Sequence, residues 1–338
     1  MKKLLTISLG LLFAFGLSGC KSKDFNYIEP KTPGEYSYDG KGRLETRITY
    51  NSNYGGYGPI ARYDGIYDEN NNLVFQYWYS YDSKSEDRLR FSDAYEIKYK
   101  DGKKDTIIGY LKNDEKVRRS RKYEYKYDGD KLKTIIEYGS NYNTGSFYKH
   151  STEEYTYDEK GNVKTITHQL VKDANIMGIS NYIYEYTYDS NDNVIKTIFK
   201  TRARSKDEWM DTECYEYTYD SNGNVLTEIM KSDRTNSPSI PWINEHKKEY
   251  GYDANNNEVF MIEYGYDEDC VAESKRETTY DSNNNKIDYK YYKMNNNSWS
   301  LYNETTYSYE NNKLKVEDHL NEKGVLIYRE EYSYKDYN

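Results

Sequence analysis

The chain has 338 residues and a formal net charge of -9 at neutral pH. Such a charge argues against nucleic acid as a partner, because the phosphate backbone is itself a polyanion. Its 44 tyrosines stand against 8 phenylalanines and 4 tryptophans, so most of the apolar surface available for burial belongs to amphipathic rings. We therefore do not expect a conventional thick core.

The N-terminus has the pattern of a bacterial export signal. Lys2 and Lys3 precede an apolar run over 4–15 that is too short to span a bilayer, and the run ends in Leu17-Ser18-Gly19-Cys20. This tetrapeptide looks like a lipobox, in which the cysteine thiol is diacylated and the signal is cut just before it. We expect a signal peptide over 1–19 and a tether over 20–34; an ordinary secretory signal with a chance cysteine is the alternative.

Acyl chains such as palmitate on Cys20 would hold the protein to a membrane, since each buried methylene contributes about 0.8 kcal/mol. Lys21 and Ser22 follow the lipid site, and no Asp occupies the position after Cys20. By resemblance to enterobacterial sorting rules, this favours the outer membrane or the cell surface. The expected location is therefore the bacterial cell envelope.

A Tyr-Asp phrase recurs along most of the remaining chain. The second tyrosine of the phrase returns about every thirty residues, at Tyr157, Tyr188, Tyr219, Tyr252, Tyr280 and Tyr309. This period indicates an array of one supersecondary unit. The copies are degenerate over 35–122 and regular over 123–338. The most irregular part, 51–122, is where we expect a specific ligand site if there is one.

Each unit predicts a strand, a tight turn and a second strand, because aromatic and Thr residues precede an Asp/Asn/Gly cluster that β-branched residues follow. The Asp opening each turn should accept hydrogen bonds from backbone N-H groups ahead of it. The turn residues expected in this role are Asp39, Asp128, Asp158, Asp189, Asp220, Asp253 and Asp281. The predicted fold is all-β, an elongated twisted antiparallel meander or spiral of hairpins with about two strands per unit.

Strand parity places the tyrosines of each unit on one face and mainly polar residues on the other. Simple alternation adds Trp209 to the aromatic face. It belongs to a column ten residues before each reference tyrosine, formed by Val117, Phe147, Trp209, Trp242, Cys270 and Trp299. Trp209, Trp242 and Trp299 are a possible stacking platform for a ligand, although packing between neighbouring units explains the recurrence equally directly.

The segment Tyr36-Ser37-Tyr38-Asp39-Gly40-Lys41-Gly42-Arg43-Leu44 closely resembles the YD (RHS) repeat, whose core is Tyr-x-Tyr-Asp-x-x-Gly-Arg-Leu. Many later copies replace the Gly-Arg with Asn-Asn or Gly-Asn. The resemblance implies hairpins that wind into a hollow β shell or binding scaffold, as in RHS toxins and teneurins. No non-repetitive C-terminal segment follows the repeats, which argues against a self-encoded cargo.

No cluster in the sequence predicts a metal, a cofactor or a nucleophile. The turn sequences place oxygens like the start of a calcium loop, but the glycine and bidentate glutamate that such a loop needs are missing. Cys214 and Cys270 lie two units apart, too far for a disulfide in a regular array. The four histidines have no metal-binding spacing, and we expect them to be solvated, at His150, His168, His246 and His319.

These patterns favour a lipid-anchored envelope or surface protein whose repeats form a non-catalytic scaffold for a glycan or protein ligand. The first alternative is a polysaccharide-processing enzyme that uses acids of the irregular segment, such as Asp64 or Asp68. In that reading, the abundance of acids hides any catalytic pair, since turns account for most Asp residues and exposed strand faces for most Glu residues. A secretion-associated shell derived from RHS proteins is the second alternative.

Overall fold

The computed structural model describes residues 42–51, 58–82, 89–113, 116–141, 144–171, 181–202, 209–232, 242–266 and 270–337. The expected signal peptide, Cys20, the tether and Asp39 lie outside these residues. The described chain forms one antiparallel sheet, with the strands β1 (Gly42–Asn51), β2 (Gly58–Asp68), β3 (Leu73–Tyr81), β4 (Leu89–Lys100), β5 (Lys103–Asn113), β6 (Lys116–Asp128), β7 (Lys131–Ser140), β8 (Phe147–Tyr157), β9 (Val163–Leu170), β10 (Asn181–Tyr188), β11 (Val194–Arg202), β12 (Met210–Tyr219), β13 (Val225–Ser232), β14 (Ile243–Tyr252), β15 (Glu258–Tyr266), β16 (Cys270–Tyr280), β17 (Lys286–Asn295), β18 (Ser298–Glu310), β19 (Lys313–Asn321) and β20 (Leu326–Tyr337).

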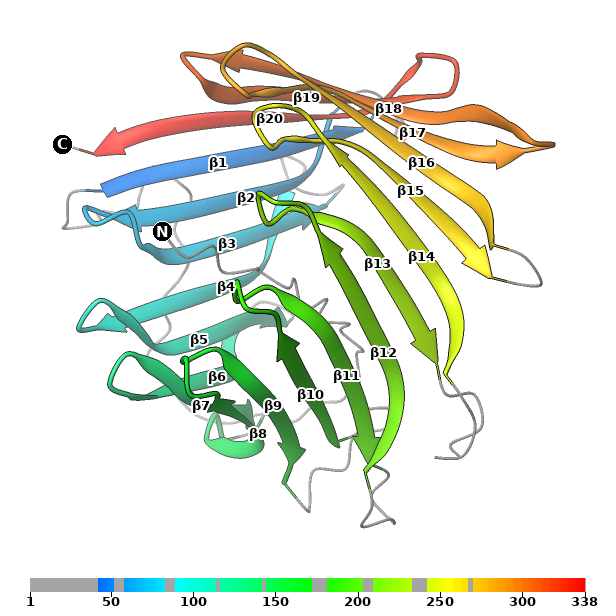
Figure 1. Ribbon diagram of the computed structural model, residues 1–338. Helices are drawn as coiled ribbons and strands as arrows, with labels where there is room; N and C mark the ends of the chain where they lie inside the picture. Colours follow the sequence, from blue (N-terminus) through cyan, green and yellow to red (C-terminus); the bar gives the residue numbers. More distant parts are fainter. Residues whose placement is uncertain are drawn as a thin grey trace.

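The sheet closes on itself (Figure 1). Each strand pairs with the next, and β20 returns to pair with β1, from Gly42 opposite Tyr337 to Asn51 opposite Tyr328. The expected open meander or spiral is therefore wrong: the molecule is a closed barrel of 20 antiparallel strands. The physical reason is that an open sheet leaves two rows of unpaired N-H and C=O groups, whereas closure removes both edges.

Two register shifts in each regular hairpin determine which way its side chains point. One shift lies at the turn, where Tyr219 pairs with Val225 although Thr218 pairs with Thr227. The other lies near the opposite end of the strand, where Glu213 pairs with Phe199 but Asp211 with Lys200. A β-bulge of this kind places two residues opposite one and reverses the alternation beyond it.

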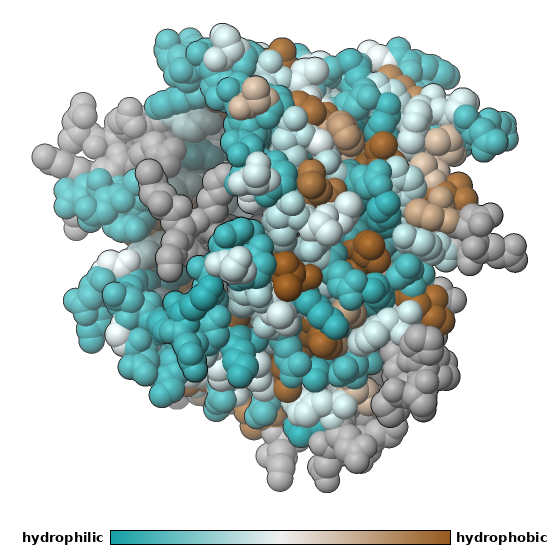
Figure 2. All heavy atoms as spheres, viewed as in Figure 1, coloured by the Kyte–Doolittle hydropathy of each residue, from teal (hydrophilic) through white to brown (hydrophobic). Residues whose placement is uncertain are grey.

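The tyrosine rows occupy the enclosed face of the barrel. Burial is the first cause of the raised pKa of Tyr125, Tyr186 and Tyr217 on this face. On the other face an ion-pair partner is the first cause of the lowered pKa of Glu249 and of the raised pKa of Lys290. Figure 2 shows hydrophilic and hydrophobic side chains interspersed on the surface over β12–β16. The outer face thus carries charged pairs, and the inner face carries stacked phenols.

Tyrosine hydroxyls join successive hairpins. The hydroxyl of Tyr219 donates to the backbone carbonyl of Val194, the first residue after the preceding turn, over 2.5 Å. The same contact recurs, with a carbonyl of the preceding hairpin as acceptor, at Tyr99, Tyr157, Tyr188, Tyr252, Tyr280 and Tyr309. The second tyrosine of the repeated phrase therefore fastens each hairpin to its predecessor.

The described residues contain one compact apolar cluster, and it lies in the irregular segment. Ile66, Tyr77, Phe91 and Ala94 are its buried members, on β2, β3 and β4. Among the described strands, β2 and β4 approach each other without being hydrogen-bonded neighbours, so the wall bends sharply at this point. Porin barrels of 16 to 18 strands are wide enough to leave a channel, so a ring of 20 strands is wider than this one apolar cluster can fill.

The part of the chain that the structure describes contains no helix with the length and hydrophobicity that a membrane crossing requires.

Candidate functional site

The turn aspartates are fully engaged by their own turns. Asp220 accepts hydrogen bonds from the backbone N-H groups of Asn222 and Asn224, both over 2.8 Å, and from the Asn224 side-chain amide over 2.9 Å. Asp189, Asp253 and Asp281 repeat this arrangement, and Asp158 accepts from Asn162. Asp128 instead ends β6 before a two-residue turn. Hydrogen bonds to the charged form lower the pKa of the Asp220 carboxyl.

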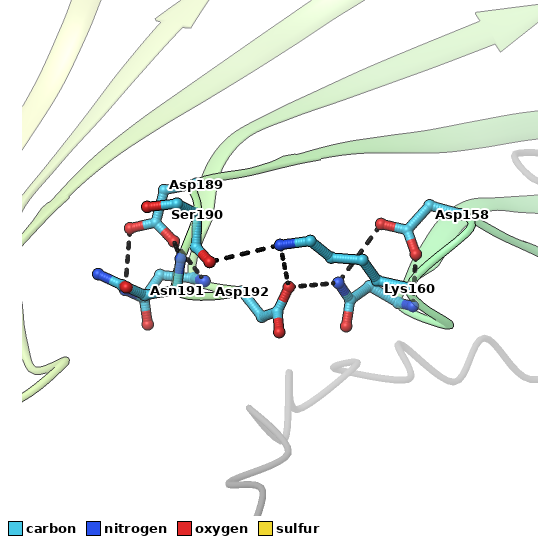
Figure 3. Close-up of polar contacts among 8 residues, drawn as sticks. Asp158, Lys160, Asp189, Ser190, Asn191 and Asp192 are labelled. Carbon is cyan, nitrogen blue, oxygen red and sulfur yellow. Dashed lines mark hydrogen bonds and ion pairs between the residues drawn. The ribbon is translucent and has the colours of Figure 1, made fainter.

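Neighbouring turns also contact each other along the rim of the barrel. Figure 3 shows the Lys160 ammonium donating to the Asp192 carboxylate over 3.0 Å and to the Ser190 carbonyl over 3.3 Å. The Asn162 amide donates to the same Asp192 oxygen over 2.9 Å. No group of His, Cys, Asp or Glu within the described residues is arranged to hold a metal ion. These contacts link one turn to the next and so have a structural role at the rim of the barrel.

The three tryptophans of the expected platform lie on the outer face, opposite the tyrosine rows. The bulge in β12 reverses the alternation before Trp209, whose ring lies under the Arg202 guanidinium at 4.7 Å. Trp299 lies in the same way under the Lys275 ammonium at 5.4 Å. The prediction of one shared aromatic face is therefore wrong. Trp209 and Trp242 border β12 and β14, with β13 between them, while Trp299 lies on β18.

The two aspartates of the enzymatic alternative have different surroundings. Asp68 opens the turn after β2 and accepts from the N-H groups of Asn70 and Asn72. Asp64 is 1 % exposed, accepts from the Thr46 hydroxyl over 2.7 Å and pairs with the Arg62 guanidinium at 3.0 Å. Burial raises the pKa of Asp64 despite these partners. The structure uses Asp68 to build a turn and Asp64 to anchor β1 against β2.

The cysteines and histidines are distributed over several strands. Cys214 is buried, Cys270 is exposed, and both thiols are free. The expectation that the histidines are solvated is wrong for His168, which is 9 % exposed on β9. His319, on β19, is also partly buried. Each of these two imidazoles stacks on a tyrosine of the next strand and belongs to a polar cluster on the enclosed face.

The His168 cluster spans β7 to β10 and consists of Glu137, Ser151, Glu153, Tyr155, His168 and Tyr182. Strand pairing sets His168 opposite Glu153 on one side and opposite Tyr182 on the other. The His168 and Tyr182 rings stack with centroids 4.5 Å apart and planes at 8°. The Glu137 carboxylate accepts from the Ser151 hydroxyl over 3.0 Å and from the Arg121 guanidinium over 3.3 Å.

Glu153 is the carboxylate of this cluster that pairs with no cation in the part of the chain that the structure describes. It accepts hydrogen bonds from the hydroxyls of Tyr155 and Tyr182. Burial raises the pKa of Glu153, the two hydroxyls offset part of that rise, and the Glu137 charge adds to it. Burial also lowers the pKa of His168, which favours the neutral imidazole.

The seam cluster lies where the barrel closes and consists of Arg47, Glu317, His319, Tyr328, Glu330 and Tyr332. The Tyr332 hydroxyl lies 3.0 Å from oxygens of both Glu317 and Glu330. Arg47 approaches Glu330 at 3.8 Å, and the Thr49 hydroxyl donates to the same carboxylate over 3.3 Å. The imidazole of His319 stacks on Tyr328 at 3.9 Å.

Cations determine the electrostatics of the seam cluster. Burial by itself would raise the pKa of Glu317, but hydrogen bonds from His319 and Tyr332 and the charges of His319 and Arg47 lower it. His319 lies 3.6 Å from Glu317 and shares a hydrogen bond with the Thr305 hydroxyl over 3.0 Å. The seam cluster therefore joins β19, β20 and β1 through the Arg47 guanidinium, the His319 imidazole and two carboxylates, and His319 Nε2 has no hydrogen-bond partner within the described residues.

Sequence reasoning missed both clusters because it assigned glutamates to the exposed strand face. The signal that would have found Glu153 is its position two residues before Tyr155, which gives the two side chains the same face of β8. Glu330 stands in the same relation to Tyr332 on β20. No comparable local signal shows that His168 and Glu153 become cross-strand neighbours.

Several solved structures resemble this chain at low similarity. The crystal structure of TcdB2-TccC3-TEV aligns with 82% of this chain and 16% of its own, at 14% identity and a TM-score of 0.37. A porin-like protein from Bacteroides uniformis ATCC 8492 aligns with 87% of this chain and 96% of its own, at 9% identity and a TM-score of 0.34. The chain thus spans only a small part of the first of these structures. TM-scores this low do not establish a shared fold, so the description of the barrel rests on its strand pairing.

No protein-family model matches the sequence, and no curated protein matches it.

Proposed function

We propose that the chain is a lipid-anchored binding shell of the bacterial envelope, which holds a glycan or protein ligand on the enclosed face of its barrel without catalysis. One observation carries this proposal: the closed wall of 20 strands presents rows of tyrosine and carboxylate side chains to a shared interior. Phenol rings offer flat apolar surface together with a polar hydroxyl, a combination suited to mixed polar and apolar ligands.

The turn aspartates and Asp64 support a binding role without catalysis, because they form contacts that hold the fold together. The turn aspartates are saturated by backbone donors, and Asp64 anchors two strands. The lipid anchor is a separate part of the proposal and rests on the sequence around Cys20. An anchored shell would keep its ligand close to the membrane while the ligand-binding face stays enclosed.

A capture experiment tests the binding role. The purified chain would be incubated with envelope glycans and envelope proteins, and retained molecules identified by mass spectrometry. Replacing the inner Tyr184 by Ala should abolish retention, whereas replacing the outer Tyr138 by Ala should leave it unchanged. Tyr184 stacks within the enclosed rows, while Tyr138 donates to Glu124 on the outer face. The proposal is contradicted if the natural chain retains no envelope molecule, or if the Tyr184 and Tyr138 variants retain equal amounts.

The anchor has its own test. Mass spectrometry of the N-terminal peptide should find acyl chains on Cys20, and Cys20→Ser should move the protein from the membrane fraction to the soluble fraction. A protein that remains in the membrane fraction after this substitution would show that the anchor lies elsewhere.

A further inference from the structure

The His168 cluster contains a partly buried carboxylate, Glu153, whose charge no cation of the described residues neutralises. Within the described residues, Glu153 forms no ion pair with Lys, Arg or His, and its neighbours are two tyrosine hydroxyls and the Glu137 carboxylate. Arg121 approaches Glu137 at 3.3 Å and is thereby assigned to that carboxylate. A buried carboxylate without a cation is costly, so the site favours any positive group that reaches it.

An independent feature of the same cluster is an unsatisfied nitrogen. His168 is 9 % exposed, and its Nδ1 atom has no hydrogen-bond partner within the described residues. Strand pairing places this imidazole directly opposite Glu153 on the enclosed face. A buried polar atom without a partner is rare in folded proteins and indicates a missing donor or acceptor. A neutral imidazole carries its proton on one nitrogen only; in the tautomer with the proton on Nε2, Nδ1 is an acceptor and the group it lacks is a donor.

Aromatic rings complete the surroundings of these two groups. Tyr182 stacks on His168 and forms an edge contact with Tyr184, with centroids 5.6 Å apart. The negative faces of phenol rings attract cations. The same protein uses this contact repeatedly with its own lysines, for example Lys131 over Tyr157 at 5.0 Å and Lys293 over Tyr302 at 4.0 Å.

We propose that the His168 cluster is a binding subsite for an alkylammonium group, with Glu153 as counter-ion, His168 Nδ1 as hydrogen-bond acceptor and Tyr182 as an aromatic wall. An ammonium group carries positive charge and three donors, so it satisfies both the carboxylate and the imidazole nitrogen. The group can belong to a free polyamine or to a lysine side chain of a protein ligand. This inference rests on the proposed binding function and specifies the chemistry of its ligand.

The seam cluster supplies an internal control. It contains the same residue types on the same face, but Arg47 already lies at 3.8 Å from Glu330 and lowers the pKa of Glu317. The carboxylates of the seam thus have a cation supplied by the protein itself, although His319 Nε2, like His168 Nδ1, has no hydrogen-bond partner within the described residues. An added ammonium group should therefore select the His168 cluster.

Calorimetric titration of the purified full-length chain with spermidine and with a short oligolysine peptide tests the inference. We expect saturable binding of at least one probe, and tighter binding of the peptide if the natural source is a lysine side chain. Glu153→Gln preserves the shape of the carboxylate without its charge and should weaken binding at least tenfold. The matched variant Glu317→Gln in the seam should change affinity less than twofold.

Folding of each variant would be checked by far-ultraviolet circular dichroism. If Glu153→Gln does not fold, Glu153→Asp withdraws the charge from the site and should weaken binding in the same direction. Absence of binding by the natural chain, or equal losses from the Glu153 and Glu317 variants, overturns the inference. Capture of an uncharged envelope ligand without ammonium binding would overturn this inference and leave the proposed shell intact, whereas failure to capture anything removes both.

Discussion

The seam cluster and the His168 cluster solve the same electrostatic problem in two ways. Each places two glutamates, a histidine and its stacked tyrosine on the enclosed face, one on β7 to β10 and the other on β19, β20 and β1. In the seam, Arg47 and His319 lower the pKa of Glu317, while in the other cluster burial raises the pKa of Glu153. The comparison separates a network whose carboxylates face an arginine of the protein from one in which Glu153 faces no cation within the described residues.

The largest expected effect comes from removing the cation of the seam. Arg47→Met should lower the free energy of unfolding by about 2 kcal/mol, because hydrogen bonds and ion contacts to buried carboxylates are worth more than neutral ones. Arg121→Met should cost about 1 kcal/mol, since Glu137 keeps the hydroxyl donors Ser151 and Tyr123. Urea denaturation measures both values, and equal losses would show that the two clusters do not differ in this way.

The glutamates themselves should respond with opposite signs. Glu317→Gln should destabilise the protein at neutral pH by about 1 kcal/mol, because the seam stabilises the charged form. Glu153→Gln should leave stability unchanged or raise it by roughly 0.5 kcal/mol, since it removes a buried charge. Thermal unfolding at pH 7 distinguishes the two, and destabilisation by both substitutions would contradict the assignment of Glu153 as unneutralised.

The pH dependence of stability sharpens the same contrast. Because its pKa is raised, folded Glu153 keeps its proton at pH values above the ordinary pKa of 4.5. Its contribution to stability is therefore lost as pH rises from 4.5 through the raised pKa. The lowered pKa of Glu317 has the reverse effect, and its contribution is lost as pH falls below the ordinary value. Urea titrations between pH 4 and pH 7 should show a steeper rise of stability with pH in Glu153→Gln than in the natural chain, and a shallower rise in Glu317→Gln.

The smallest effect is expected at the histidines. His168→Phe keeps the stack on Tyr182 and removes the nitrogen without a partner, so stability should change by less than about 0.5 kcal/mol. His319→Phe loses the contact with the Thr305 hydroxyl and should cost about 1 kcal/mol. Chemical denaturation of the two variants measures these losses. Titration with the ammonium probe is the second measurement, and it should show that only His168→Phe weakens binding.

Local chemistry made parts of this molecule predictable, and long-range pairing did not. The Asp-Asn turns could be predicted because one side chain and its own backbone determine them, as at Asp220 and Asn224. Closure could not, because nothing near Gly42 in the sequence indicates that it pairs with Tyr337. The outward position of Trp209 was also missed, since a single inserted residue in β12 reverses the alternation and has no distinctive composition.

The candidate site was harder to predict for the same reason. Glu153 and Tyr155 share a face through simple alternation, yet His168 and Tyr182 join them only through the register of β8, β9 and β10. The lipid anchor at Cys20 and the ligand class remain predictions for the experiments described above.

Antiparallel pairing of β1 with β20 has a consequence for how such a molecule can change size. A ring of alternating strand directions closes only with an even number of members, so a lone strand cannot be gained or lost. The repeated unit is itself a pair of strands, and duplicating or deleting one copy keeps the ring closed. Evolution can therefore change the diameter of the barrel only in steps of one whole hairpin. A wider or narrower ligand would require a different number of repeat copies.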